Sequence, residues 1–224
     1  MTCMGTRSCY LALWNAAVKS CMEYDAEAFK ENLDWFRYLP APGQISDEEF
    51  YLEYCFVVLH PGVSTVVAHS VWDRIRPILD QPLPRIVRNE KRVRTQLLRM
   101  YRNERKVGYM LDTARYLVAN PGVGRRLERM GREQALKYLQ TLPGIGKVTR
   151  YHLARNIGFD VVKPDRHLTR LAEVLGTTPN ELCCVVAEET GERVGVVDYV
   201  FYQWCAWAGF DEVGEVARAI CAAS

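Results

Sequence analysis

The sequence lacks the features that mark several large classes of protein. It has no run of about 18 uncharged apolar residues, so a membrane partner is not expected. Its eight cysteines form no C-x-x-C pair and its four histidines have no close ligand spacing, so neither a metal nor another cofactor is expected. No strand-like alternation of useful length, internal repeat or low-complexity segment is present. These absences favour an all-α fold.

The cysteines favour a reduced protein. Several lie in apolar stretches that are expected to be helical, where a free cysteine packs as a small hydrophobic residue. Cys183 and Cys184 are adjacent, which suits neither a metal site nor an ordinary disulfide. We therefore expect all eight cysteines to be reduced thiols and the protein to be cytoplasmic.

Charge is distributed unevenly along the chain. The 224 residues include 29 Lys and Arg and 27 Asp and Glu, a net charge of +2. Residues 74–170 hold 23 of the basic and 8 of the acidic residues, a local net charge of +15, which leaves −13 for the remainder. Such a segment suits contact with phosphates. Alternatively, its charges pair with the acidic flanks across the fold.

Proline, glycine and capping residues predict helices joined by short turns. Ser46 followed by Glu49 forms a capping box before a helix that is apolar nearly all round and should be buried. Ser64 should cap the next helix, and the prolines at 77, 82 and 84 should mark a loop. The expected helices span residues 10–19, 27–38, 46–59, 64–79, 88–101, 103–120, 131–139, 167–175, 179–189, 197–207 and 212–222.

The stretch Leu142-Pro143-Gly144-Ile145-Gly146-Lys147 predicts a tight turn between two helices. Its glycines permit close backbone approach, and a second helix is expected from about Lys147. The free amides and the helix dipole would bind a phosphate there without reading sequence. Lys147, Thr149 and Arg150 would add to this grip. A lone G-x-G between helices is weak evidence, since many helix–helix turns contain glycine.

Asp165 follows this turn at a distance of 19 residues, in the string Lys163-Pro164-Asp165-Arg166-His167. Because Pro164 keeps Lys163 extended, Asp165 should stand at the start of a helix. It could serve only as the N-cap, which is a common role for aspartate. It could equally be a functional carboxylate, and one side chain can do both.

The segment LPGIGKVTRYHLARNIGFDVVKPDRHLTRL resembles the helix-hairpin-helix (HhH-GPD) DNA glycosylase superfamily, in its branch without an iron–sulfur cluster. The resemblance continues in EEFYLEYCFVVLHPGVSTVVAHSVW, similar to the family's buried helix and base-insertion loop. RNERKVGYMLDTARYL is similar to a helix of the archaeal oxidised-guanine branch. Roughly residues 48–209 are covered. The resemblance implies a two-lobed helical fold over residues 46–224, with the hairpin at 131–157 and an N-terminal helical extension at 1–45.

The resemblance also implies an enzyme of base excision repair. A DNA N-glycosylase flips a damaged or modified base out of double-stranded DNA and hydrolyses its bond to the sugar, and 8-oxoguanine is one candidate base. Asp165 would be the catalytic carboxylate near the oxocarbenium-like transition state. A nucleoid-associated monomer is expected. The residues expected to contact DNA are Gly144, Ile145, Gly146, Lys147, Thr149, Arg150, Arg166 and His167.

The base pocket or the inserted residues are expected among His60, Gly62, Val63, Tyr202, Trp204 and Trp207, with Phe201 as a further aromatic. The aromatic residues at the end of the chain could instead belong to the core. The family often has glutamine in the insertion loop, where Gly62 stands here. His60, Val63 or Ser64 would then fill the gap.

Two further departures limit the chemistry. Members that also nick the strand carry a lysine two residues after the second hairpin glycine, and Val148 stands there. Lys147 lies one residue earlier, which turns it by about 100° on a helix, so a monofunctional enzyme is expected. The iron–sulfur cysteine signature is also missing, so no cluster is expected. Two alternatives stay open: derivatisation of a thymine-like base in phage DNA by the same fold, and a non-catalytic DNA clamp.

Overall fold

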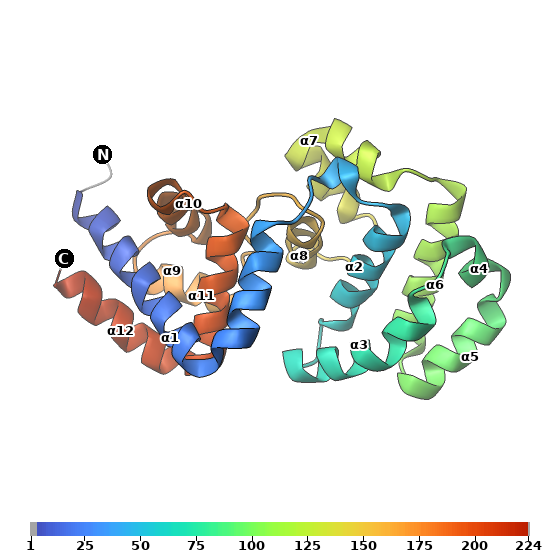
Figure 1. The fold of residues 1–224 in the computed structure, drawn as a ribbon, viewed down its shortest axis with the longest axis horizontal. Helices are drawn as coiled ribbons and strands as arrows, with labels where there is room; N and C mark the ends of the chain where they lie inside the picture. Colours follow the sequence, from blue (N-terminus) through green and yellow to red (C-terminus); the bar gives the residue numbers. More distant parts are fainter. Residues whose placement is uncertain (1–3, 224) are drawn as a thin grey trace. The chain divides into compact units, whose positions relative to one another are not determined.

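The secondary structure of the protein is helical. The computed structural model describes residues 4–223, and over that range it contains no strand, which confirms the all-α prediction (Figure 1). No helix in this range is both long and apolar enough to cross a membrane. The α-helices are α1 (Met4–Arg37), α2 (Asp47–Leu59), α3 (Thr65–Leu79), α4 (Leu83–Arg88), α5 (Glu90–Met100), α6 (Glu104–Ala119), α7 (Val123–Leu139), α8 (Thr149–Asn156), α9 (Arg166–Val174), α10 (Pro179–Thr190), α11 (Val194–Ala208) and α12 (Phe210–Ala222), and a 3₁₀ turn, η1, spans Pro42–Gln44.

The chain folds into two compact units. Unit 1 consists of residues 4–39 and 160–223, and unit 2 consists of residues 40–159. The predicted division at residue 45 followed the extent of the family resemblance and stays a prediction. Unit 2 carries 20 Lys and Arg against 11 Asp and Glu, a net charge of +9, so the rest of the chain has −7. The charge asymmetry of the sequence therefore follows the structural division.

Unit 1 is built on the packing of α1 along α11. The sequence predicted two helices, residues 10–19 and 27–38, and the structure joins them at a kink at Asp25, where φ is −156° and ψ is 90°. The Asp25 carboxylate accepts a hydrogen bond from the Ala28 amide at 3.1 Å, so it caps the second half of α1. Phe36 packs on Tyr199 of α11 with 4.7 Å between ring centroids.

The first and last helices of unit 1 are joined by a disulfide between Cys9 and Cys221. The prediction that all eight cysteines are reduced is wrong for this pair. The packing of α1 against α12 brings the two Cα atoms to 5.2 Å, a normal separation for a bridge. Cys21, Cys55, Cys183, Cys184 and Cys205 form no disulfide, and Cys3 lies outside the described residues.

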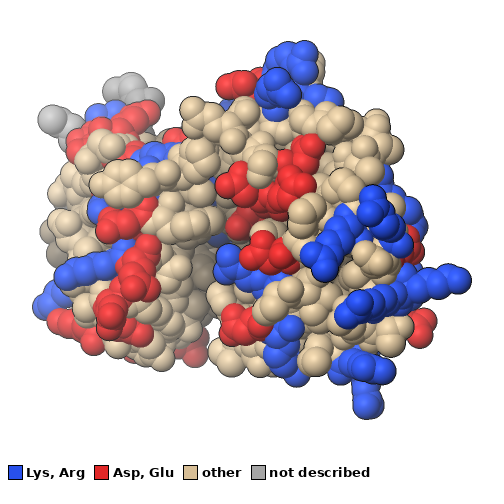
Figure 2. All heavy atoms as spheres, turned by 45° about the vertical axis from the view of Figure 1, so that its right-hand side comes forward, with Lys and Arg blue, Asp and Glu red and all other residues tan. Residues whose placement is uncertain are grey.

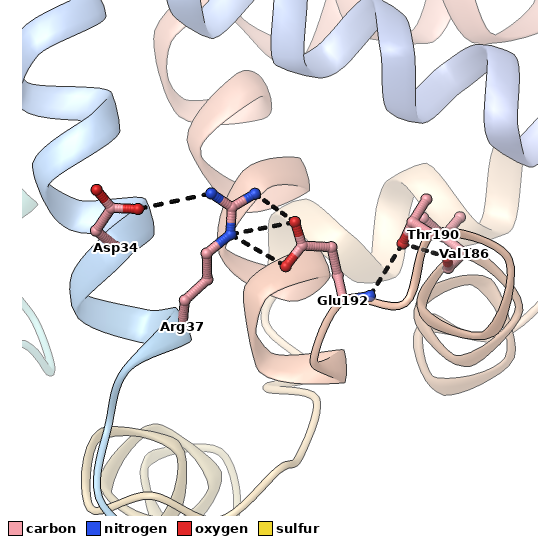
Figure 3. A network of polar contacts seen from close by, with 5 residues as sticks. All are labelled: Asp34, Arg37, Val186, Thr190 and Glu192. Carbon is pink, nitrogen blue, oxygen red and sulfur yellow. Dashed lines mark hydrogen bonds and ion pairs between the residues drawn. The ribbon is translucent and has the colours of Figure 1, made fainter.

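A polar network connects the C-terminal end of α1 to the turn between α10 and α11 (Figure 3). Arg37 Nε donates to both carboxylate oxygens of Glu192 at 3.1 Å, and Asp34 lies 3.6 Å from the same guanidinium. The Glu192 amide donates to Thr190 Oγ1 at 3.4 Å, and this hydroxyl donates to the Val186 carbonyl at 2.7 Å. The contact with Glu192 raises the pKa of Arg37.

Unit 2 is organised around α2, as its apolar sequence predicted. The capping box is confirmed: the Glu49 amide donates to Ser46 Oγ at 3.2 Å and the Ser46 amide donates to Glu49 Oε2 at 2.8 Å. Asp47, the first residue of α2, accepts hydrogen bonds from the amides of Gly122 and Val123, each at 2.7 Å, and so fixes the start of α7. Tyr54 donates from its hydroxyl to the Pro143 carbonyl at 2.7 Å. The buried helix thus holds the glycine-rich turn in place.

Two helices of unit 2 differ from the prediction. A loop was expected around the prolines at 77, 82 and 84, but Pro77 lies inside α3 and the short helix α4 begins at Leu83. Pro84 fits the first turn of α4 because its missing N–H is not needed there. The helix expected over residues 131–139 begins earlier, at Val123, and bends at Gly131, where φ is 68°.

Candidate nucleic-acid interface and catalytic carboxylate

The glycine-rich turn of unit 2 connects α7 to α8. The Ile145 amide donates to the Leu142 carbonyl at 3.1 Å, and Gly144 has a φ of 74°. A Cβ atom at Gly144 would lie 2.7 Å from the ring of Tyr109, so only glycine fits this position. The structure therefore contains the predicted tight turn at residues 142–147, which lies within the hairpin predicted at 131–157 and is held against α6.

α8 begins at Thr149, two residues later than the prediction. The reason is that the Gly146 amide donates to Thr149 Oγ1 at 2.6 Å, which closes one further turn before the helix. The amides of Lys147 and Val148 donate to no backbone or side-chain acceptor in the described part of the chain. Both residues are exposed, and they directly precede α8.

The predicted DNA-contacting side chains of the hairpin differ in availability. Lys147 is exposed and makes no hydrogen bond or ion pair within residues 4–223. Arg150 is half-buried, donates to Gln140 Oε1 at 2.8 Å and lies 4.9 Å from the ring centroid of Tyr151. The Ile145 side chain is buried, so only its backbone could reach a ligand.

Asp165 of unit 1 is the N-cap of α9. Its Oδ1 accepts hydrogen bonds from the amides of His167 at 2.9 Å and Leu168 at 3.1 Å. Its Oδ2 lies 3.1 Å from Lys163 Nζ, and the side chains of this ion pair are only 13% and 12% exposed. The N-cap role that the sequence suggested is thus present. The second oxygen is paired with a cation that the sequence analysis did not assign to it.

The surroundings of Asp165 hold several polar groups in place. Lys163 Nζ lies 4.6 Å from the ring centroid of Tyr202, and the Lys163 amide donates to Asp198 Oδ1 at 3.2 Å. His167 packs edge-on against Tyr202 at 5.7 Å, and burial lowers the pKa of its imidazole. Asp198 was not predicted from the sequence. An acidic residue inside the apolar stretch 194–208 nevertheless indicates a buried carboxylate that needs polar partners.

A thiol is also close to the carboxylate. Burial, with a further contribution from the negative charge of Asp165, raises the pKa of Cys205 to about 12. Cys205 is therefore a neutral thiol at physiological pH and not a nucleophile.

Arg166, which was predicted to contact DNA, is exposed, with its Nε 3.4 Å from His167 Nε2.

Of the candidate pocket aromatics of unit 1, one lies beside the partners of Asp165 and the others pack elsewhere. Trp204 and Phe201 are buried in the core, as the core interpretation expected. Trp207 stacks on Tyr24 with 4.6 Å between ring centroids. Tyr202 alone lies against the partners of Asp165.

The loop between α2 and α3, the candidate insertion loop of unit 2, carries an apolar tip. Gly62 is exposed with a φ of 81°, and Val63 is 37% exposed. Val66 and Val67, in the first turn of α3, are 79% and 48% exposed. Val63 was predicted from the sequence, whereas Val66 and Val67 were missed, because their exposure depends on where the first turn of α3 lies.

His60 closes α2 and belongs to a cluster of rings in unit 2. Its ring centroid lies 4.6 Å from Phe56, 5.0 Å from His152 and 6.1 Å from His69. Within residues 4–223, no three His, Cys, Asp or Glu side chains lie close enough together to hold a metal ion. The cluster is therefore one of ring packing.

Comparisons with known proteins give no relative. No family model, curated protein or solved structure matches this chain. The site must therefore be interpreted from its own chemistry.

That chemistry is divided between the units. Unit 2 contains the exposed amides and Lys147 of the hairpin and the valine tip, which are suited to a phosphate and to an apolar partner. Unit 1 contains a carboxylate that is fixed by two amides and one ammonium group.

Proposed function

We propose that this protein is a monofunctional DNA N-glycosylase that acts as a monomer on double-stranded DNA. The observation that carries the proposal is the Asp165 carboxylate, whose oxygens are both held in position: Oδ1 by two helix amides and Oδ2 by Lys163. Such fixation serves a reaction in which positive charge develops on a sugar, because a preorganised anion stabilises that charge without reorganising.

The hairpin supports the DNA part of the proposal. The amides of Lys147 and Val148 have no acceptor in the described chain, and the positive end of the α8 dipole adds to them. Lys147 supplies an exposed cation beside them. These groups suit a phosphate of any sequence, as an enzyme that scans DNA requires.

The valine tip supports a base-flipping step. Apolar side chains that enter a duplex unstack the bases at that step, and Val63, Val66 and Val67 provide such a surface. Val148 lies where strand-nicking relatives of the resembled family carry lysine, so the proposed product is an intact strand with an abasic site.

The test is a panel of duplexes that each carry one modified base, including 8-oxoguanine, incubated with wild type and with Asp165→Asn. We expect wild type to release one free base and Asp165→Asn to release it about 10²–10³-fold more slowly, with DNA affinity retained. Thr178→Ala is the matched control, because Thr178 caps α10 of the same unit by accepting from the Glu181 amide at 3.1 Å. It loses a cap of similar energy and should keep full activity.

Other outcomes would contradict the proposal in different ways. A nucleoside of increased mass, with no free base, would identify a base-modifying enzyme. Salt-dependent DNA binding with no product from any duplex would identify a clamp. A borohydride-trapped covalent adduct would rule out the monofunctional assignment.

A further inference from the structure

A second basic surface of unit 2 lies outside the hairpin. It consists of the exposed or half-buried cations of α4, α5 and the residues leading into α6, and we call it the cationic face. Its members are Arg85, Arg88, Lys91, Arg92, Arg94, Arg99, Arg102 and Arg105. The same stretch holds two acids, Glu90 and Glu104, and Glu90 is already paired with Arg115 of α6.

The side chains of the cationic face have no partner within the protein. None of the eight side chains donates a hydrogen bond or forms an ion pair within residues 4–223. The arginines of α7 differ, since Arg126 and Arg129 donate to the carbonyls of Pro121 and Arg125, and Arg132 pairs with Glu133 at 3.7 Å. Eight unpaired cations repel one another, so the cationic face is an arrangement that an external anion would stabilise.

The helical geometry makes the cationic face a row. Val93 and Leu97 are the buried residues of α5, and Arg92 and Arg99 are exposed, seven residues and therefore about 10 Å apart on one side of the helix. Arg102, in the short connection from α5 to α6, is also exposed. A duplex presents one negative charge for about each 1.7 Å of its axis. A row of cations of this length can therefore contact several phosphates along one backbone.

The cationic face is separate from the hairpin within unit 2. α4 and α5 pack against each other, α3 and α6, whereas the hairpin is bordered by α7 and α8 and is held by α2 and by Tyr109 of α6. Arg105, one turn before Tyr109, is the member of the cationic face nearest the hairpin in α6, and the other seven precede α6. Figure 1 draws α4 and α5 at the side of unit 2 away from α8. Figure 2 brings that side forward, and Lys and Arg side chains extend from it.

The composition of the cationic face selects among anionic partners. Seven of its eight cations are arginine, whose planar fork binds phosphate oxygens in pairs. A membrane surface is disfavoured, because a helix that lies in a lipid interface needs a continuous exposed apolar side. In α5, Val93 and Leu97 are buried and Leu98 is half-buried, so Met100 is the one exposed apolar residue of this helix.

We propose that the cationic face is a second DNA-binding surface, which holds the phosphate backbone of a stretch other than the one at the hairpin. The identity of the partner rests on the proposed function. A second backbone contact would raise the affinity for undamaged DNA and keep the enzyme on long duplexes while it searches for a base.

The test measures the affinity for a long undamaged duplex between about 50 and 200 mM salt. The triple variant Arg92→Gln, Arg99→Gln, Arg102→Gln should lose three phosphate contacts, so the slope of log K against log salt should become less steep by about 3. The matched control is Arg126→Gln, Arg129→Gln, Arg132→Gln, which neutralises the three α7 arginines that have partners within the protein and changes the net charge of unit 2 equally. Its slope should equal that of wild type.

Each result separates this inference from the proposed function. Equal slopes for wild type and the α5 variant, or equal losses in the α5 and α7 variants, overturn the second surface and leave the glycosylase proposal standing. An α5-dependent slope without base release overturns the glycosylase alone. Loss of binding to anionic phospholipid vesicles in the α5 variant, with DNA binding unchanged, would assign the cationic face to a membrane and overturn this inference.

Discussion

Single buried polar side chains fix the backbone next to the candidate site, and Lys106 is the clearest case. From α6 its Nζ donates to the carbonyls of Leu59 at 2.6 Å and Pro61 at 2.8 Å, at the end of α2 and the start of the insertion loop. Burial lowers the pKa of Lys106. The cation thus holds the loop that carries the valine tip.

Lys106→Met should destabilise the protein by about 2 kcal/mol, because the buried carbonyl of Leu59 and the part-buried carbonyl of Pro61 lose their donor. Urea unfolding measures the loss. Lys91→Met, at an exposed position, is the control and should change stability by less than about 0.5 kcal/mol. Equal effects of the two variants would mean that Lys106 does not hold the loop.

Glu53 makes the stability of unit 2 depend on pH. It is half-buried on α2, accepts a hydrogen bond from Asn156 Nδ2 at 2.9 Å, and burial raises its pKa to about 7. In the unfolded chain its pKa is lower, near 4.5. The folded state therefore binds a proton that the unfolded state has released, and this contribution to stability is lost as pH rises from about 4.5 through 7.

Glu53→Gln keeps an acceptor for Asn156 and removes the charge. We expect the variant to be more stable than wild type at pH 8 by about 2 kcal/mol, and the difference to disappear toward pH 5. Denaturant unfolding across this range is the measurement. A difference that is constant with pH would show that burial of the charge is not its origin.

At the scale of elements, the hairpin depends on one of its glycines more than on the other. The sequence assigned a tight turn and close approach to both Gly144 and Gly146. Only Gly144 has a positive φ and a neighbour, Tyr109, in the space of a Cβ atom. At Gly146 the nearest atom to a Cβ is Thr149 Oγ1 at 3.8 Å.

Gly144→Ala should therefore destabilise the protein by about 2 kcal/mol, through backbone strain and the clash with Tyr109. Gly146→Ala should be nearly neutral in stability, since an ordinary van der Waals contact replaces open space. Thermal unfolding followed by circular dichroism compares them. Similar melting temperatures would contradict the structural distinction between the two positions.

The elements that were predictable from sequence are those with local causes. Ser46 and Ser64 cap α2 and α3 as expected, because a cap involves residues within one turn of each other. The start of α7 was missed because Asp47, some 75 residues earlier in the chain, supplies its cap. The kink at Asp25 was seen only as a gap between two helices.

The candidate site, too, was predictable from the sequence only where its contacts are local. Asp165 was found because it stands at a predicted helix start, but its pairing with Lys163 depends on how the chain turns at Pro164, and Asp198 fixes the Lys163 backbone from another helix. Trp204 and Tyr202 share one aromatic stretch in the sequence. Only packing against α1 and α9 separates the core tryptophan from the tyrosine beside Lys163.

At the scale of the whole molecule, the Cys9–Cys221 disulfide joins the two ends of the chain across 212 residues. No local pattern could predict it, because the two cysteines meet only when α1 and α12 pack. In the chain-entropy account, closing so long a loop restricts the unfolded state by about 5 kcal/mol, and measured gains are often smaller. A bridge of this kind suits an oxidising environment, and the expected cytoplasmic location stays a prediction.

Cys221→Ser tests the bridge, because Cys221 is exposed and the hydroxyl adds no buried polar group. The variant should melt roughly 10 °C below oxidised wild type. Wild type treated with a reductant should fall to the same temperature, and the variant should not respond to the reductant. Cys184→Ser, which changes a half-buried thiol outside the bridge, is the control and should keep the reductant-sensitive step. If wild type melts at one temperature with and without reductant, the bridge contributes nothing to stability, and the packing of α12 on α1 and α11 is sufficient to hold the end of the chain.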